Sequence, residues 1–458
     1  MTATVKGIAG CAMAASEASS YGGAVTVEAS EKGGGVAPRV PAVRVDDPAR
    51  AATFSALGAR DFRVFWYGSL VSSIGMTMQH FALGWFVVEL AVRDGAPERA
   101  SLYAGVVGLS YSVPALLLGI IAGVVVDRGD RRRILLLEQC VELLCAAGMA
   151  ALTVTGAADL GWVLVVGGIT SVAGCFGRLA RQAILPGLTG PARLMSAVGL
   201  NSSAIGFSAI AGPAIGGLLI GPLGVGGVLL VDAAASVVAL WCLALVPPQR
   251  AADTGPQSGL VASIRPGLAF VRDRAFVRWQ LFLLLAVTMF ANPIRELLPA
   301  YVSDVLHKGA VELSWLAAAI GIGGLVATLV AAVVGARRGR GRVFVASSLG
   351  SGLVLVLFGA QRSLVPAIVL VAVVAFLMVS AAVLCTMITQ LTTPDPLLGR
   401  VVGVHHFVVE IGIAAGTLLV GAVGSLVGVG TAMTAAGVLL TMAALLVFAR
   451  APQLRSIP

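Results

Sequence analysis

The chain has 458 residues, of which 58% are hydrophobic and 12% are charged, and its mean hydropathy is +0.96. A water-soluble core of this length cannot hide so much apolar surface, so the composition excludes a soluble globular protein and indicates that the bilayer is the solvent. The formal net charge is +9, but the basic residues lie between apolar runs and are not gathered on one face. This distribution argues against nucleic acid as a partner and favours membrane lipid.

Residues 1–57 are rich in alanine, glycine, serine and valine and show no sustained hydrophobic period. They predict either a disordered cytoplasmic tail or a start codon assigned too far upstream. Lysine occurs only at Lys6, Lys32 and Lys308, and arginine supplies every other basic position. With the abundance of alanine, glycine and valine, this usage is typical of a GC-rich bacterial genome.

Twelve apolar runs of roughly 20 residues follow, each long enough to cross a bilayer as a helix. They lie at 64–91, 102–126, 134–156, 161–179, 195–220, 224–246, 278–304, 313–336, 343–361, 365–391, 403–425 and 428–449. Residues 247–277 separate the two sets of six, and contain Pro247-Pro248 and an amphipathic stretch from Ser263 to Arg274. The sequence predicts an all-α membrane protein with six-helix bundles at 58–246 and 278–450, a cytoplasmic linker and a cytoplasmic tail at 451–458.

The positive charges predict the orientation. If both termini are cytoplasmic, the cytoplasmic segments hold all of the 31 lysine and arginine residues except Arg93, Arg99, Arg295, Lys308 and Arg362. Such an asymmetry is what the positive-inside rule describes for a multi-pass protein of the bacterial cell membrane.

Three loops occur twice, in the same order. The segment from Asp127 to Arg133 matches the one from Arg337 to Arg342, about 206 positions later when Arg131 is set against Arg337. At similar offsets, 60–66 matches 273–279 and 186–193 matches 394–400. Repeats of this kind are typical of a two-halved membrane transporter.

These features together resemble the major facilitator superfamily. Its signature loop between spans 2 and 3 is matched here by Gly123, Asp127, Arg128, Arg131 and Arg132, with Asp130 in place of the usual glycine. We expect Asp127 to accept hydrogen bonds from the N-terminal end of span 11 near Gly403, which would latch the halves in the outward-facing state. The alternative is that the arginines only anchor the loop to anionic lipid, which is the role expected of Arg133.

A second motif lies in span 5 and resembles the antiporter motif of the drug-exporting branch. It consists of Gly199, Ser208, Gly212, Pro213, Gly216 and Gly217, with Ser208 where the family motif has glycine. The resemblance implies efflux, whereas ordinary close packing of membrane helices is the alternative. Arg181-Gln182-Ala183 leading to Pro186, and Gly399-Arg400-Val401, are similar to the subfamily that contains the bacterial enterobactin exporter.

Charged and polar side chains within the spans are the candidates for the substrate and proton pathway. Asp232 would lie roughly 12 Å deep at about 1.5 Å per residue, and Glu410 at a similar depth. Both are candidates for proton coupling, or alternatively neutral acids bonded to a neighbouring helix. The other candidates are Gln79, His80, Arg295, Glu296, Asn201 and Asn292.

Each of these has a plainer alternative. Arg295 is a candidate to hold an anionic group of the substrate, or else to form an extracellular gate pair. His80 is a candidate to titrate, or else a satisfied hydrogen-bonding residue. Glu138 and Glu142 share one face of span 3, where an ion-pair network with Arg178 or Arg181 is favoured over transport chemistry.

The resulting hypothesis is a secondary transporter that uses the proton gradient to export a small amphipathic molecule such as a drug, natural product or siderophore. Proton-coupled uptake is the alternative within the same fold, and a membrane sensor or enzyme is the alternative from another class. The sequence lacks His-Glu-x-x-His, Gly-x-Ser-x-Gly and a phosphate-binding loop, so we expect no enzyme activity and no direct use of ATP. The adjacent His405 and His406 are not spaced for joint metal ligation on one helix face, so we expect no metal, and no other cofactor. A monomer is usual for the proteins it resembles.

Overall fold

The computed structural model describes residues 54–248, 268–334 and 339–455, and Ala51–Pro458 forms one compact unit. Almost all of the predicted N-terminal tail and most of the predicted linker, including 263–267 of the amphipathic stretch, lie outside the described residues. The division of the chain at 247–277 therefore stays a prediction. Residues 268–273, within that stretch, are helical, and the Arg274 guanidinium lies over the Phe270 ring at 4.4 Å from its centre.

The described residues are helical and contain no strand, which confirms the predicted all-α fold. The long helices are α2 (Arg60–Arg93), α3 (Ala100–Arg128), α4 (Arg131–Val154), α5 (Leu160–Thr189), α6 (Leu194–Leu245), α8 (Ala275–Phe290), α9 (Ile294–Asp304), α10 (Ala310–Val334), α11 (Arg340–Gly359), α12 (Leu364–Thr392), α13 (Asp395–Val427) and α14 (Val429–Arg450). Short helices lie at Ser55–Gly58, Pro97–Arg99, Pro191–Arg193 and Pro452–Arg455.

Ten helical stretches of the described chain are long and apolar enough to cross a membrane. One of them, Pro191–Leu245, contains two helices that meet at Gly224, whose φ of 66° and ψ of 177° are not helical. The 34-residue helix α2 is also long enough to span, although its polar residues lower its hydropathy. Counted this way, the described chain crosses the membrane twelve times, as the hydropathy pattern predicts.

Local chemistry explains several helix ends. The Asp130 carboxylate accepts the backbone N–H of Arg132 at 3.0 Å and caps α4, and Asp159 caps α5 through the N–H of Trp162 at 3.0 Å. Span 7 is broken into α8 and α9 at residues 291–293, because Pro293 has no backbone N–H with which to continue the helix. The predicted end of span 4 is ten residues too early, because α5 continues through Pro186 to Thr189.

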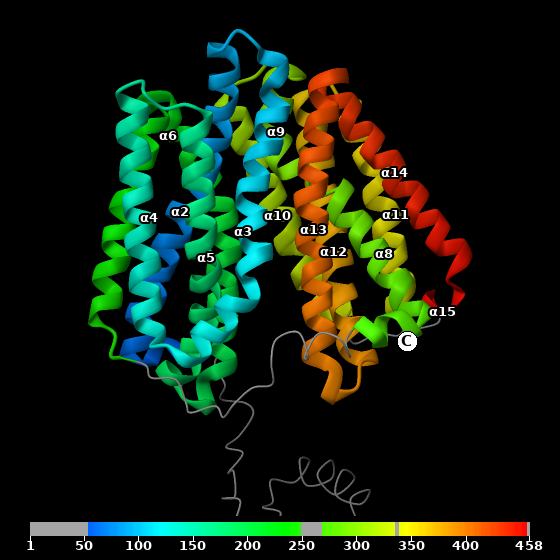
Figure 1. Cartoon of the computed structure of the whole chain (residues 1–458), viewed down its shortest axis with the longest axis horizontal. Coiled ribbons are helices and arrows are strands. Elements are labelled where there is room, and N and C mark those ends of the chain that lie inside the picture. The colour runs from blue at the N-terminus through cyan, green and yellow to red at the C-terminus, as the bar shows by residue number, and fades with distance from the viewer. Residues whose placement is uncertain (1–53, 249–267, 335–338, 456–458) are drawn as a thin grey trace, which may run out of the picture. The chain divides into compact units, whose positions relative to one another are not determined.

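The helices form two groups whose most extensive contacts run along two pairs of helices. In the first group α6 packs against α2 and α4, and α3 packs against α5; in the second α11 packs against α14, and α10 against α12. Helix α3 contacts α13, and α6 contacts α10 (Figure 1). Helix α9 of the second group also contacts α3 and α2 of the first group, less extensively.

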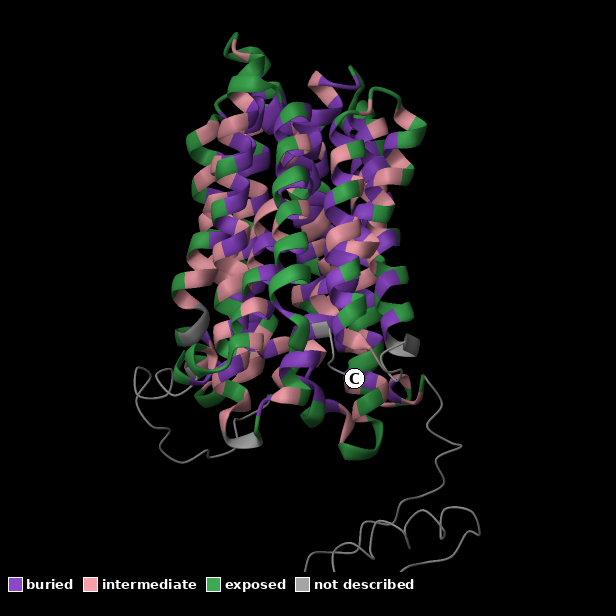
Figure 2. Ribbon diagram, turned by 90° about the vertical axis from the view of Figure 1, so that its right-hand side faces the viewer, coloured by how far each residue is buried: buried purple, intermediate pink, exposed green. Residues whose placement is uncertain are grey.

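The apolar core joins the two groups at one end only. At the end of the bundle where Leu90, Ala100 and Val163 lie, a large cluster includes buried residues of both groups, such as Leu298 and Ala432. At the opposite end the first group has its own cluster around Phe62 and Ile184, and the second has another around Phe344 and Ile388. Many large hydrophobic residues are exposed, among them Leu144, Trp241 and Phe448, as expected of surfaces in contact with lipid. Figure 2 shows exposed residues, in green, along the length of the helices.

Candidate functional site: a central cavity and a buried polar cluster

A cavity of about 290 Å³ lies between the two helix groups, where α2, α6, α9 and α10 meet. It is lined by Thr77, His80, Phe81, Gly84, Ala209, Pro213, Arg295, Glu296, Leu298, Pro299, Leu313, Ala317, Ile320 and Gly321. Phe81, Leu298, Leu313 and Ile320 also belong to the cluster that joins the two groups. The cavity therefore lies against the closed end of the boundary.

Three charged or titratable side chains meet in this cavity. The break between α8 and α9 brings Arg295 and Glu296 to its wall, where the Arg295 side chain is exposed to the cavity although it is deep in the protein. Arg295 makes no ion pair with the described residues, while Glu296 interacts electrostatically with Arg295 and His80. His80 donates from Nδ1 to the carbonyl of Met76 at 2.8 Å, which leaves Nε2 available.

The span 5 motif brings α6 close to two other helices. A Cβ on Gly216 would lie 3.0 Å from Met78 of α2, and one on Gly212 would collide with Thr77, whose hydroxyl donates to the Ser208 carbonyl at 2.9 Å. A Cβ on Gly217 would collide with Ser314 of α10. Ser208 is buried and Pro213 lines the cavity, whereas Gly199 has no atom within 4 Å of its Cβ position.

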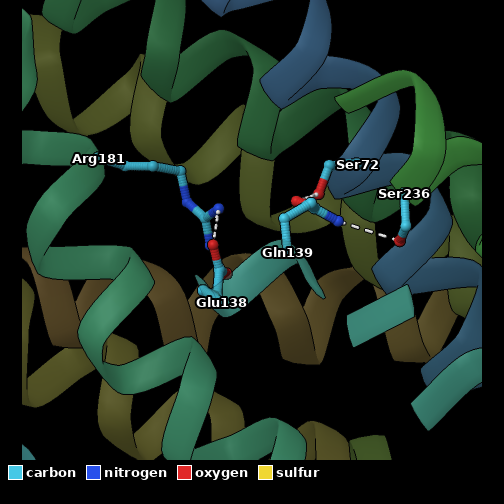
Figure 3. Close-up of polar contacts among 5 residues, drawn as sticks. All are labelled: Ser72, Glu138, Gln139, Arg181 and Ser236. Atoms are coloured by element: carbon cyan, nitrogen blue, oxygen red, sulfur yellow. Dashed lines mark hydrogen bonds and ion pairs between the residues drawn. The ribbon is translucent and has the colours of Figure 1, made fainter. Parts of the chain in front are cut away.

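A polar cluster fills the centre of the first helix group (Figure 3). Gln139 of α4 accepts from the Ser72 hydroxyl of α2 at 2.8 Å and donates to the Ser236 hydroxyl of α6 at 3.0 Å. Beside it, the Arg181 guanidinium of α5 donates to both oxygens of Glu138 at 3.0 and 2.7 Å. The predicted ion pair with Glu138 is thus formed by Arg181, in a bidentate geometry.

The next turn of the same cluster lacks these bonds. Asp232 is 1% exposed and Gln79 is fully buried, yet neither side chain has a hydrogen bond to the described residues. Glu142, 5% exposed, has one oxygen, Oε1, without a partner among the described residues. The backbone of Gly75 makes room for the Asp232 carboxylate, because a Cβ at that glycine would collide with Oδ1.

The signature loop lies at the open end of the boundary. Asp127 and Arg128 are exposed, and among the described residues Asp127 has neither hydrogen bond nor ion pair. Gly403 and Gly123 have no atom within 4 Å of their Cβ positions, so the predicted latch onto span 11 is not formed in this conformation. Arg132 instead donates to the Leu243 and Ala244 carbonyls at 3.0 and 2.8 Å and so caps α6, while Arg131 is half-buried.

The remaining predicted residues lie apart from both polar regions. Glu410 of α13, Asn201 of α6 and Asn292 are half-buried, do not line the cavity, and make no side-chain hydrogen bond with the described residues. Four further polar residues of these regions were not predicted from the sequence, namely Gln139, Ser72, Ser236 and Tyr111. A glutamine next to a glutamate in an otherwise apolar span was the available signal for the first of these.

Comparison with known proteins places the chain in a family. The profile of the transmembrane secretion effector family matches residues 51–457. The chain is 28% identical over 347 residues to the multidrug efflux pump Tap of Mycobacterium tuberculosis, covering 74% of this chain and 81% of that protein. It is 27% identical over 330 residues to the enterobactin exporter EntS of Shigella boydii, covering 70% of this chain and 77% of that protein.

Solved structures with the same fold are more distant in sequence. The nucleoside transporter NupG superposes with a TM-score of 0.66 at 13% identity over 85% of this chain and 98% of that one. A D-xylose-proton symporter superposes with a TM-score of 0.64 at 15% identity over 86% of this chain and 98% of that one. The chain therefore belongs to the transmembrane secretion effector family, and is a multi-pass membrane transporter of the major facilitator superfamily.

Proposed function

We propose that the protein exports a small amphipathic organic molecule across the bacterial cell membrane in exchange for protons. The observation that carries the proposal is the cavity between the helix groups, where Arg295, Glu296 and His80 lie in otherwise apolar walls. Family membership and the two similar proteins named as an efflux pump and an exporter support the outward direction.

The charge distribution supports an orientation. If both termini are cytoplasmic, the separate clusters around Phe62 and Phe344 lie on the cytoplasmic side and the shared cluster lies outside. The conformation is then inward-facing, and substrate reaches the cavity from the cytoplasm. Export requires the α3–α13 and α6–α10 contacts to part outside while the halves close inside, where Asp127 would meet the start of α13.

Asp232 is the leading candidate for proton coupling. An ionised carboxylate that is buried without hydrogen-bond partners is costly, so a proton bound there is held until water or another group reaches it. Glu410 is the second candidate, since it lies in α13 at the boundary between the helix groups. The proton gradient then takes the place of any bound cofactor, and the monomer is the working unit.

The cavity chemistry supports a substrate that is mainly apolar and carries a polar or charged group. Its apolar residues offer surface for an aromatic or aliphatic body, and Arg295 offers an unpaired cation among the described residues. Drugs, natural products and siderophores fit this description. Proton-coupled uptake is the second candidate, because a solved proton symporter shares the fold.

The test is the accumulation of a panel of dyes, antibiotics and siderophores in cells, with and without a protonophore. Cells expressing the wild type should accumulate less of at least one compound than cells expressing Asp232→Asn, and a protonophore should remove the difference. Glu89→Gln is the matched control, because Glu89 is an exposed acid of α2 that lies outside the cavity and the polar cluster. Higher accumulation with the wild type would indicate uptake, and equal accumulation of every compound would refute transport of this panel.

A further inference from the structure

The unsatisfied turn of the polar cluster contains three buried side chains from three helices. Gln79 of α2, Glu142 of α4 and Asp232 of α6 are 0%, 5% and 1% exposed, and all three have polar atoms without a partner among the described residues. Gln79 lies one turn from Gly75, on the face of α2 that meets Asp232. Helix α4 and the second half of α6 run antiparallel, since Gln139 bonds Ser236 and Gly226 packs against Ala150. Glu142 and Asp232 each lie one turn further along this contact.

In the neighbouring turn the buried polar groups are hydrogen-bonded. There Gln139 bonds both serines, and Glu138 receives both of its bonds from Arg181. Buried polar groups in native proteins are almost always hydrogen-bonded, and two carboxylates in a dry site do not both ionise readily. A proton placed on one acid creates the O–H donor that the other acid and the Gln79 amide oxygen lack.

A tyrosine connects this turn to the central cavity. The Tyr111 hydroxyl of α3 is buried without a partner among the described residues, and it interacts electrostatically with both Glu142 and Glu296. Its ring lies 4.7 Å from the ring of His80, measured between centroids. His80 and Glu296 both line the cavity, so Tyr111 lies between the cavity groups and the buried acids.

We propose that Asp232 and Glu142 form one proton-binding site that holds a single shared proton, with Gln79 as its positioning residue and Tyr111 as the link to His80 and Glu296. The inference rests on the proposed proton coupling. It adds Glu142 as the partner acid of Asp232 and a route by which the proton reaches the cavity. The other titratable groups that face the site are Glu138 and Cys145 of α4, and Arg181 of α5.

The proton transfer balances through Tyr111. The transfer requires the Tyr111 hydroxyl to come within hydrogen-bonding distance of the acids and of His80 or Glu296, which it is not in this conformation. The shared proton then leaves the carboxyl group for the Tyr111 oxygen as the Tyr111 hydroxyl proton passes to His80 Nε2 or Glu296, so one proton leaves the buried site and one arrives in the cavity. Transfer in the reverse order reloads the site when the cavity faces the outside.

The test is infrared difference spectroscopy of purified protein, which detects the carbonyl stretch of a protonated carboxyl group as the pH is changed. Wild type should show a buried carboxylic acid band, and both Asp232→Asn and Glu142→Gln should shift or abolish that same band. Glu89→Gln should leave it unchanged. A band that Asp232→Asn removes while Glu142→Gln leaves it unaltered, or two bands lost independently, would overturn the shared site.

A transport assay separates this inference from the proposed function. The probe is ethidium if the panel shows that the protein carries it, and otherwise the compound that the panel identifies. Glu142→Gln should reduce protonophore-sensitive transport at least tenfold, and Tyr111→Phe should slow it while preserving the infrared band. If Glu142→Gln does not fold, Glu142→Asp should shift the band and weaken coupling. Proton-driven transport that survives Glu142→Gln would refute the inference alone, whereas wild-type transport without proton dependence would refute the proposed coupling.

Discussion

The first helix group contains two successive turns of buried polar side chains, and only one of these turns has its hydrogen bonds and ion pair formed. Sequence spacing places Glu138 and Glu142 on one face of α4, and from this alone both are expected in the same ion-pair network. Only Glu138 pairs with Arg181, and Glu142 is left beside Asp232. The spacing identifies the shared face correctly, but the reach of Arg181 depends on how α5 packs on α4, which the sequence does not contain.

The Glu138–Arg181 pair should act as a structural element. Removing one member leaves the other charge buried without its partner, and we expect Glu138→Gln or Arg181→Met to destabilise the protein by about 3 kcal/mol. Replacing both, as Glu138→Met with Arg181→Met, should recover most of that loss because no unpaired charge remains. Thermal unfolding in detergent measures the effect. Single variants as stable as the wild type would show that the pair does not contribute to the stability of the protein.

Gly75 should be needed for the buried acid site. A methyl group at this position would collide with Asp232 Oδ1, so Gly75→Ala should displace the carboxylate and reduce proton-dependent transport several-fold. Gly148→Ala in α4 is the matched control, because its Cβ would have no atom within 4 Å. The initial rate of protonophore-sensitive efflux is the readout, and equal rates for both variants would argue against close packing at Asp232.

Among the elements, α6 combines features that the sequence predicts with contacts that it does not. The two apolar runs at 195–220 and 224–246 predict two spans, and the structure turns between them at Gly224. The small residues of the span 5 motif predict close approach of some helix, but their partners are α2 for Gly212 and Gly216, and α10 for Gly217. Helix neighbours depend on packing between distant segments, so a local motif cannot name them.

The Gly217 contact should matter more than the motif's first glycine. Gly217→Ala would push a methyl group against Ser314 at the boundary between the two groups, whereas Gly199→Ala would meet open space. We expect Gly217→Ala to reduce transport at least several-fold, and Gly199→Ala to leave it near the wild-type level. Efflux rates normalised to the amount of protein in the membrane make the comparison, and the reverse order of effects would contradict it.

At the scale of the whole molecule, hydropathy predicts the twelve crossings and charge predicts their orientation, because both depend on composition along the chain. The conformational state is a different matter. The conformational state follows from the apolar clusters. At one end a single cluster contains residues of both helix groups, and at the other end each group has a separate cluster. No pattern in the sequence specifies which end is closed, since an alternating transporter must be compatible with both arrangements.

A disulfide across the closed end should therefore stop transport. A Cβ at Gly424 of α13 would lie 3.1 Å from Ser101 Cβ of α3, slightly shorter than a typical disulfide allows, so small adjustments permit the bond. We expect Ser101→Cys with Gly424→Cys, in a background without the native cysteines, to lose transport on oxidation and regain it on reduction. Full activity of the oxidised, cross-linked protein would mean that this boundary does not open.

The central claim is proton-driven export by alternating access, and inverted membrane vesicles test it most directly because their interior corresponds to the outside of the cell. The measurement is uptake of an exported compound from the panel when an acid-inside pH gradient is imposed. The wild type should accumulate the compound, a protonophore should abolish accumulation, and Asp232→Asn should show none. Accumulation that is unchanged without the gradient, or that occurs only with the gradient reversed, would contradict the account.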